Sequence, residues 1–71
     1  MPKLPVISGR KMVHVLRKLG YEEKRQRGSH LIMIKEGKLI VVPNHKELRR
    51  GTLRSIMREA NLTVGELIAL L

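Results

Sequence analysis

The spacing of apolar and polar residues predicts the order helix, strand, strand, strand, helix and short helix. The first helix is expected to begin after Ser8, a good N-cap, and to end before Gly20, which suits the left-handed position after a helix. Between these ends, Met12, Leu16 and Leu19 recur at helical spacing and predict one face that packs on a core. This segment is therefore expected to be an amphipathic helix.

Three strands are expected next. A charged edge strand is predicted over residues 21–27, and two apolar strands are predicted over residues 31–35 and 39–42. The Glu36-Gly37 dipeptide between the last two is typical of a tight hairpin turn. We expect one face of these two strands to carry Ile32, Ile34, Ile40 and Val42 and the other to carry Leu31, Met33, Leu39 and Val41. Because helices on one side cover only one face, we expect a second chain to cover the outer one.

The rest of the chain is predicted to form a loop over residues 43–50 and two helices. Thr52 is expected to cap the first of these helices, and Asn61 is expected to take the left-handed position at its end. Its core face is expected to contain Leu53, Ile56, Met57 and Ala60. Thr63 and Glu66 have the spacing of a capping box for the last short helix. The predicted fold class is α+β, with a three-stranded antiparallel sheet packed on helices.

The length of 71 residues is typical of one small domain, which we expect to span residues 1–71. A chain this short buries only about 60% of its unfolded surface, so a homo-oligomer or a partner protein is expected. The chain has no cysteine, and no apolar stretch approaches the roughly 20 residues of a membrane span. There is also no signal-peptide pattern, so we expect a cytoplasmic protein without a membrane partner.

The balance of charge favours a polyanionic partner. Fifteen lysines and arginines against six acidic residues give a formal net charge of +9, which suits nucleic acid or an acidic protein surface. All six acidic residues are glutamates, and their spacing does not suggest the carboxylate cluster of a two-metal nuclease. Tyr21 is the only aromatic residue, so a base-stacking platform is not expected. Phosphodiester chemistry would then depend on histidine, lysine and arginine, without a metal or cofactor.

Candidate chemistry concentrates in the segment that leads into the central strand. Lys24, Arg25 and Arg27 could neutralise RNA phosphates, and Ser29 could donate a hydrogen bond to one. His30 is expected at the start of the strand, where an imidazole can transfer a proton near neutral pH. Each of these residues also has a purely structural alternative. His30 could be a strand-edge histidine that is hydrogen-bonded to the backbone. The three cations could be the solvated side chains of an edge strand, and Ser29 could simply be part of a turn.

Two further groups of residues are candidates. His45 could supply the second proton transfer that RNA cleavage needs, although a loop histidine followed by lysine can also be merely exposed. A basic track into and along the second helix could bind RNA phosphates, and it consists of Arg49, Arg50, Arg54 and Arg58. The alternative for this track is the ordinary charged outer face of an amphipathic helix.

Several short motifs match one family in order along nearly the whole chain. They are Ser8-Gly9, Leu16…Leu19-Gly20-Tyr21, Arg25-Gln26-x-Gly28-Ser29-His30, Val42-Pro43-x-His45 and Glu47-Leu48-x-x-Gly51-Thr52-Leu53-x-x-Ile56. On these residues the chain resembles the HicA toxins of bacterial and archaeal toxin–antitoxin pairs, which are small ribonucleases that cleave messenger RNA.

The resemblance implies a fold like that of a double-stranded-RNA-binding domain, with the order α-β-β-β-α. It implies that His30, in the family's Gly-Ser-His position, is the catalytic histidine. It also implies a HicB-type antitoxin that covers the active site and is usually encoded alongside. Asn61 departs from the glycine that the family commonly has there, and asparagine should leave the helix end intact.

Two other functions fit the same residues. A non-catalytic RNA-binding module of the same fold would use the basic faces but would yield no cleavage products. An interaction protein would dock an acidic partner on its positive surface. Apart from these functions, an apolar outer sheet face predicts that the isolated protein self-associates.

Overall fold

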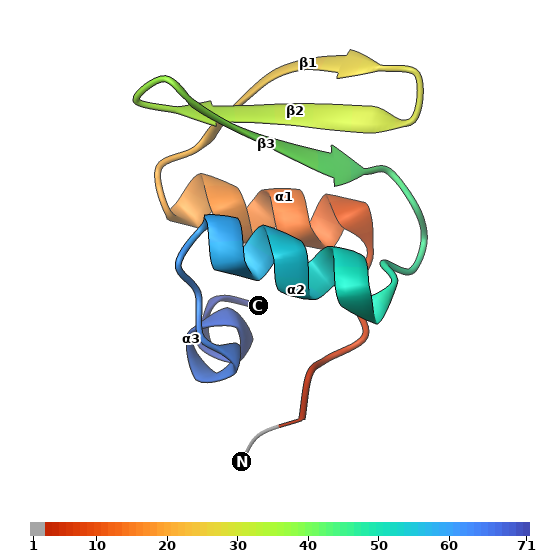
Figure 1. The fold of residues 1–71 in the computed structure, drawn as a ribbon, viewed down its shortest axis with the longest axis vertical. Helices are drawn as coiled ribbons and strands as arrows, with labels where there is room; N and C mark the ends of the chain where they lie inside the picture. The colour runs from red at the N-terminus through yellow and green to blue at the C-terminus, as the bar shows by residue number, and fades with distance from the viewer. Residues whose placement is uncertain (1–2) are drawn as a thin grey trace.

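The computed structural model describes residues 3–71 and has the predicted order of elements (Figure 1). The elements are α1 (Gly9–Lys18), β1 (Glu22–Arg27), β2 (His30–Lys35), β3 (Lys38–Pro43), α2 (Arg50–Glu59) and α3 (Val64–Leu70). The strands form an antiparallel sheet in the order β1-β2-β3, and α1 and α2 lie on the same side of it. The predicted α+β class is confirmed, and the α-β-β-β-α order agrees with a fold like that of a double-stranded-RNA-binding domain.

Local capping contacts define both ends of α1. The Ser8 hydroxyl accepts a hydrogen bond from the backbone N–H of Lys11 at 3.0 Å, which satisfies an amide that has no partner inside the helix. At the other end, Gly20 has a φ of 98°, in the left-handed region that favours glycine. This turn lets the N–H of Tyr21 donate to the carbonyl oxygen of Leu16 at 3.0 Å. Both predicted ends of the helix are confirmed.

The register of the β2–β3 hairpin decides which side chains share a face. Glu36 and Gly37 have φ values of 49° and 81°, as a two-residue hairpin turn requires, so Lys35 pairs with Lys38. Every even-numbered residue of β2 therefore pairs with an odd-numbered residue of β3, and the predicted division of the faces is wrong. The inner face carries Leu31, Met33, Ile40 and Val42, and the outer face carries Ile32, Ile34, Leu39 and Val41.

The start of α2 also differs from the prediction. The helix begins at Arg50 with Arg49 as its N-cap, so the prediction that Thr52 caps it is wrong. The backbone is already anchored before this point, because Leu48 is buried and its N–H donates to the carbonyl oxygen of Ile7 at 2.8 Å. This anchor brings the chain into the helix three residues earlier than the local capping preference of threonine suggests.

The remaining predicted helix signals are confirmed. Asn61 has a φ of 57°, and the N–H of the next residue, Leu62, donates to the carbonyl oxygen of Met57 at 2.8 Å. At α3, the Thr63 hydroxyl accepts from the Glu66 N–H at 3.1 Å, and the Glu66 carboxylate accepts from the Thr63 N–H at 2.9 Å. The bonds from the Thr63 backbone and then its side chain lower the pKa of Glu66 below its ordinary 4.5.

The core lies between the inner face of the sheet and the helices. Its fully buried side chains are Met12, Val15, Leu16, Leu31, Met33, Ile40, Val42, Leu53 and Leu67. The outer face has no helix on it in the part of the chain that the structure describes (Figure 1). Leu39 and Val41 on this face are 50% and 45% exposed, whereas Ile32 is only 8% exposed on the middle strand. The outer face therefore leaves the apolar side chains of β3 open to solvent.

Candidate nucleic-acid interface

Four chain segments meet at one end of the molecule (Figure 1). They are the start of α1, the loop between β1 and β2, the end of β3 and the start of α2. We call this region, residues 8–11, 27–30 and 43–50, the His30 end. The opposite region contains the Glu36-Gly37 turn and the C-terminal ends of α1 and α2, and we call it the hairpin-turn end.

His30 is the first residue of β2, and its side chain is exposed. It pairs with Arg27 of β1 and with Pro43 of β3, so its backbone lies between two neighbouring strands. Strand alternation puts it on the outer face with Ile32, away from the helices. The imidazole is therefore displayed to solvent from a rigid position in the sheet.

Backbone hydrogen bonds join the neighbouring loops to this strand. The N–H of Asn44 donates to the carbonyl oxygen of Ser29 at 2.6 Å, and the N–H of Gly9 donates to that of His45 at 2.9 Å. Gly9 lies so close to β3 that a β-carbon on it would be 2.0 Å from the carbonyl oxygen of Pro43. Three segments that are far apart in the sequence therefore contact one another at the start of β2.

Arg25 and Arg27 lie on the same face of β1, because they pair with Ile32 and His30 on the outer face. Gln26 lies on the inner face, where its amide oxygen is 3.4 Å from a guanidinium nitrogen of α1. The two outer arginines and the imidazole thus share one surface.

The other candidates of this segment lie where the strand pairing is irregular. Lys24 lies at a register shift in β1 and is exposed. Ser29 is also exposed, in the turn between β1 and β2. Gly28 in the same turn has a φ of 55°, and the Gln26 side chain donates to its carbonyl oxygen at 2.9 Å. The glycine is therefore needed for the turn itself.

Arg49 and Arg50 bring two exposed cations to the His30 end, and Arg54 lies one turn further along α2. The first amides of a helix give its N-terminal end a partial positive charge, and neither α1 nor α2 has an acidic residue in its first turn. Within residues 3–71, the ion pairs join arginines of α1 to Glu23, so Arg49, Arg50 and Arg54 form no ion pair there. The start of α2 is therefore suited to attract an anion.

His45 lies in the loop after β3, two residues beyond the register partner of His30. Its backbone carbonyl accepts the bond from Gly9, and its side chain is exposed. Within residues 3–71, neither the His30 nor the His45 imidazole forms a hydrogen bond with the protein. The fold thus brings both histidines to one end of the molecule and leaves their side chains exposed to solvent.

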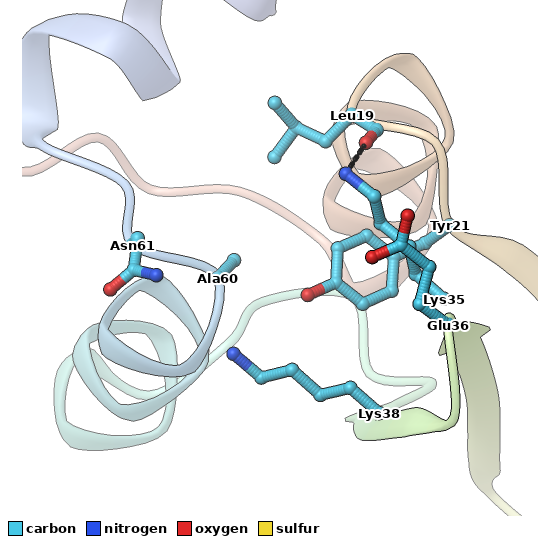
Figure 2. Close-up of a pocket in the computed structure, with 7 residues that line it drawn as sticks. All are labelled: Leu19, Tyr21, Lys35, Glu36, Lys38, Ala60 and Asn61. Carbon is cyan, nitrogen blue, oxygen red and sulfur yellow. Dashed lines mark hydrogen bonds between the residues drawn. The ribbon is translucent and has the colours of Figure 1, made fainter.

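A hollow of about 390 Å³ lies at the hairpin-turn end, away from His30 (Figure 2). Both lysines that line it already donate hydrogen bonds to the protein backbone. The Lys35 Nζ donates to the Leu19 carbonyl oxygen at 2.7 Å, and the Lys38 Nζ donates to the Glu59 carbonyl oxygen. Both carbonyls belong to the negative C-terminal ends of helices. Because no histidine lines this hollow, the candidate site remains the His30 end.

Residues 3–71 contain neither a metal-binding cluster nor a membrane-spanning helix. No group of three or more His, Cys, Asp or Glu side chains is arranged there to hold a metal ion. No helix in the same part of the chain has the length and apolar character needed to cross a membrane.

A comparison with known protein families matches residues 9–62, from the first residue of α1 to the turn after α2. The matched family is described as HicA toxin of bacterial toxin-antitoxin. The chain belongs to the HicA toxin family. HicA toxins are known as mRNA interferases and pair with HicB antitoxins. A search of curated proteins gave no match.

In this HicA chain, sequence reasoning missed the contact between Gly9 and the end of β3. The available signal was a glycine in the first turn of a helix, where its conformational freedom costs stability. The sequence does not reveal why a glycine is needed at this position, because Pro43 comes close to Gly9 only in the tertiary structure. The sheet face that carries His30 was not readable either, since it depends on strand register.

Proposed function

We propose that this HicA toxin is an endoribonuclease that cleaves messenger RNA without a metal ion, with His30 as general acid or general base. The observation that supports this proposal is the position of His30, which is exposed at the start of the central strand with Arg27 in register beside it. An imidazole carried on a rigid strand, next to a cation that forms no ion pair within residues 3–71, suits proton transfer at a phosphodiester.

The proposed reaction starts with removal of the proton from a 2′-hydroxyl of the RNA. The 2′-oxygen bonds to the adjacent phosphorus, the bond from phosphorus to the 5′-oxygen breaks, and the leaving oxygen takes up a proton. His30 makes one of these two transfers, and His45 is the proposed group for the other. Arg25 and Arg27 stabilise the negative charge of the phosphorane between them. The products carry a 2′,3′-cyclic phosphate and a 5′-hydroxyl.

We propose that RNA binding extends from His30 over neighbouring polar and basic residues. Besides the two arginines of β1, the proposed contacts to phosphates come from Lys24, Ser29, Arg49, Arg50 and Arg54. Ser29, Arg49 and Arg50 belong to the His30 end, and Arg54 lies one helical turn beyond it on α2. Such backbone contacts fix the position of the RNA but do not read its bases.

The test is cleavage of a labelled RNA by the purified toxin in EDTA. His30→Ala is expected to lower the rate at least about 100-fold, the smaller end of the usual contribution of general acid–base catalysis, in a protein that stays folded. His14→Ala is the matched control, because His14 is an exposed histidine on α1. Wild-type cleavage by His30→Ala would remove His30 from the mechanism. If the wild-type toxin binds RNA but yields no fragments, it is a non-catalytic RNA-binding module instead.

We also propose that the HicB antitoxin covers the outer face of the sheet. This face carries His30 together with the exposed Leu39 and Val41, so a protein seated there would bury apolar area and block the imidazole at once. Replacing both apolar residues with serine is expected to weaken antitoxin binding at least about tenfold, since burying each contributes roughly 1.5–3 kcal/mol.

Isothermal titration with the cognate antitoxin measures this effect. Ile68→Ser is the control, because Ile68 is an apolar residue of similar exposure, 42%, that lies on α3 and not on the sheet. Wild-type affinity in the double variant would show that the antitoxin binds elsewhere. Sedimentation of the toxin alone tests whether the same face also joins two copies, and a stable monomer at high concentration would contradict that expectation.

A further inference from the structure

Gly9 is buried at the first position of α1 and touches the end of β3. An ideal β-carbon on it would lie 2.0 Å from the carbonyl oxygen of Pro43, 3.0 Å from its carbonyl carbon and 3.2 Å from the Cα of Asn44. All three are backbone atoms, which cannot rotate away as the end of a side chain can. Only glycine therefore lets α1 and β3 lie this close together.

Hydrogen bonds hold the same segment from both sides. The Gly9 N–H, which has no acceptor inside α1, donates to the carbonyl oxygen of His45 at 2.9 Å. On the other side, the Asn44 N–H donates to the carbonyl oxygen of Ser29 at 2.6 Å. The chain that leaves β3 is thus clamped between the start of α1 and the turn that leads into β2.

We propose that Gly9 is a positioning residue for His30. This inference rests on the proposed role of His30 in RNA cleavage. Pro43 pairs with His30 in the sheet, so a displacement of the Pro43-Asn44 segment is transmitted to the backbone that carries the imidazole. Relaxing the 2.0 Å contact to the 3.0 Å that β-carbons tolerate requires a shift of about 1 Å. A shift of that size can lower a catalytic rate about 100-fold.

The test compares Gly9→Ala with two control variants. Gly65→Ala adds the same methyl group in the first turn of α3, away from the His30 end, where the new β-carbon would lie 4.0 Å from the Thr63 hydroxyl oxygen, an ordinary contact distance. Val13→Ala removes buried apolar atoms from α1, further along the helix, and so lowers stability without adding an atom next to β3. RNA cleavage kinetics and the NMR signals of the His30 ring are measured on each folded protein.

Gly9→Ala is expected to lower kcat about 100-fold with little change in KM, because the basic residues that bind RNA remain in place. Its His30 ring signals are expected to shift from their wild-type positions. Both control variants are expected to keep the wild-type kcat and the wild-type His30 signals. A loss of stability alone would lower the melting temperature of Val13→Ala without these changes.

Unchanged kcat and unchanged His30 signals in Gly9→Ala would overturn the proposal. An equal loss of kcat in Val13→Ala would overturn it too, because stability would then explain the effect. If Gly9→Ala does not fold, the contact serves folding and the positioning role is refuted. If the wild-type toxin does not cleave RNA, the proposed function fails, and the His30 signals still decide whether Gly9 positions the imidazole.

Discussion

The two ends of the molecule carry cations in opposite electrostatic surroundings. At the hairpin-turn end, Lys35 and Lys38 donate to carbonyl oxygens at the C-terminal ends of α1 and α2. Each lysine ammonium meets the negative end of a helix there, so its charge is partly compensated by the protein. At the His30 end, Arg49 and Arg50 stand at the positive end of α2, and within residues 3–71 neither forms an ion pair.

This difference shows how the same types of residue can serve folding at one end and binding at the other. The first turns of α1 and α2 lack acidic residues, whereas α3, away from the site, has Glu66 in its first turn. Cations beside a helix N-terminus are unfavourable until an anion joins them. The His30 end therefore keeps a positive field that RNA phosphates can neutralise, whereas the lysines at the hairpin-turn end are already bonded within the protein.

The largest expected difference is in RNA cleavage. Arg27→Ala removes the cation in register with His30 and is expected to lower kcat about 100-fold, as the loss of one donor to a transition-state oxyanion does. Lys38→Ala removes the same charge at the hairpin-turn end and is expected to leave the rate within about twofold. Cleavage assays at several salt concentrations measure both. Equal losses in the two variants would show that only net charge matters.

The next effect concerns stability, for which a lysine at the hairpin-turn end is expected to matter more than one at the His30 end. Lys35→Met is expected to lower the free energy of unfolding by about 1 kcal/mol, because the carbonyl of Leu19 loses a charged hydrogen-bond donor. Lys46→Met, in the exposed loop at the His30 end, is expected to change it by less than about 0.5 kcal/mol. Urea unfolding measures both values. A larger loss in the Lys46 variant would contradict the division between the two ends.

The smallest effect is a pH dependence at α3. The bonds from Thr63 depress the pKa of Glu66 in the folded protein below 4.5, so the stabilisation is complete above pH 4.5 and is lost as the pH falls through the depressed pKa. Glu66→Gln lacks this ionisation. Wild type is therefore expected to be more stable than Glu66→Gln at neutral pH, and the difference should shrink in acid. Urea unfolding at about pH 7 and about pH 3 checks this, and a difference that grows in acid would refute the assignment.

Features that depend on near neighbours along the chain could be predicted from the residue types alone. Ser8, Gly20 and Asn61 mark helix ends through contacts within one turn, and Thr63 and Glu66 form their capping box the same way. Such contacts are encoded in a short window, so the residue types suffice to predict them. The position of His30 at the start of the central strand followed likewise from a turn signal before an apolar run.

How these elements meet could not be predicted, because it depends on contacts between residues far apart in the chain. The faces of β2 and β3 depended on register, and a shift of one residue exchanges the two faces. The start of α2 depended on the anchor at Leu48, which outweighed the capping preference of Thr52. The contact of Gly9 with Pro43 joins residues far apart in the chain, and packing of the helices against the sheet's inner face creates it. Which side chains share the His30 end is therefore a result of folding, because apolar burial and strand pairing, rather than any local signal, bring those segments together.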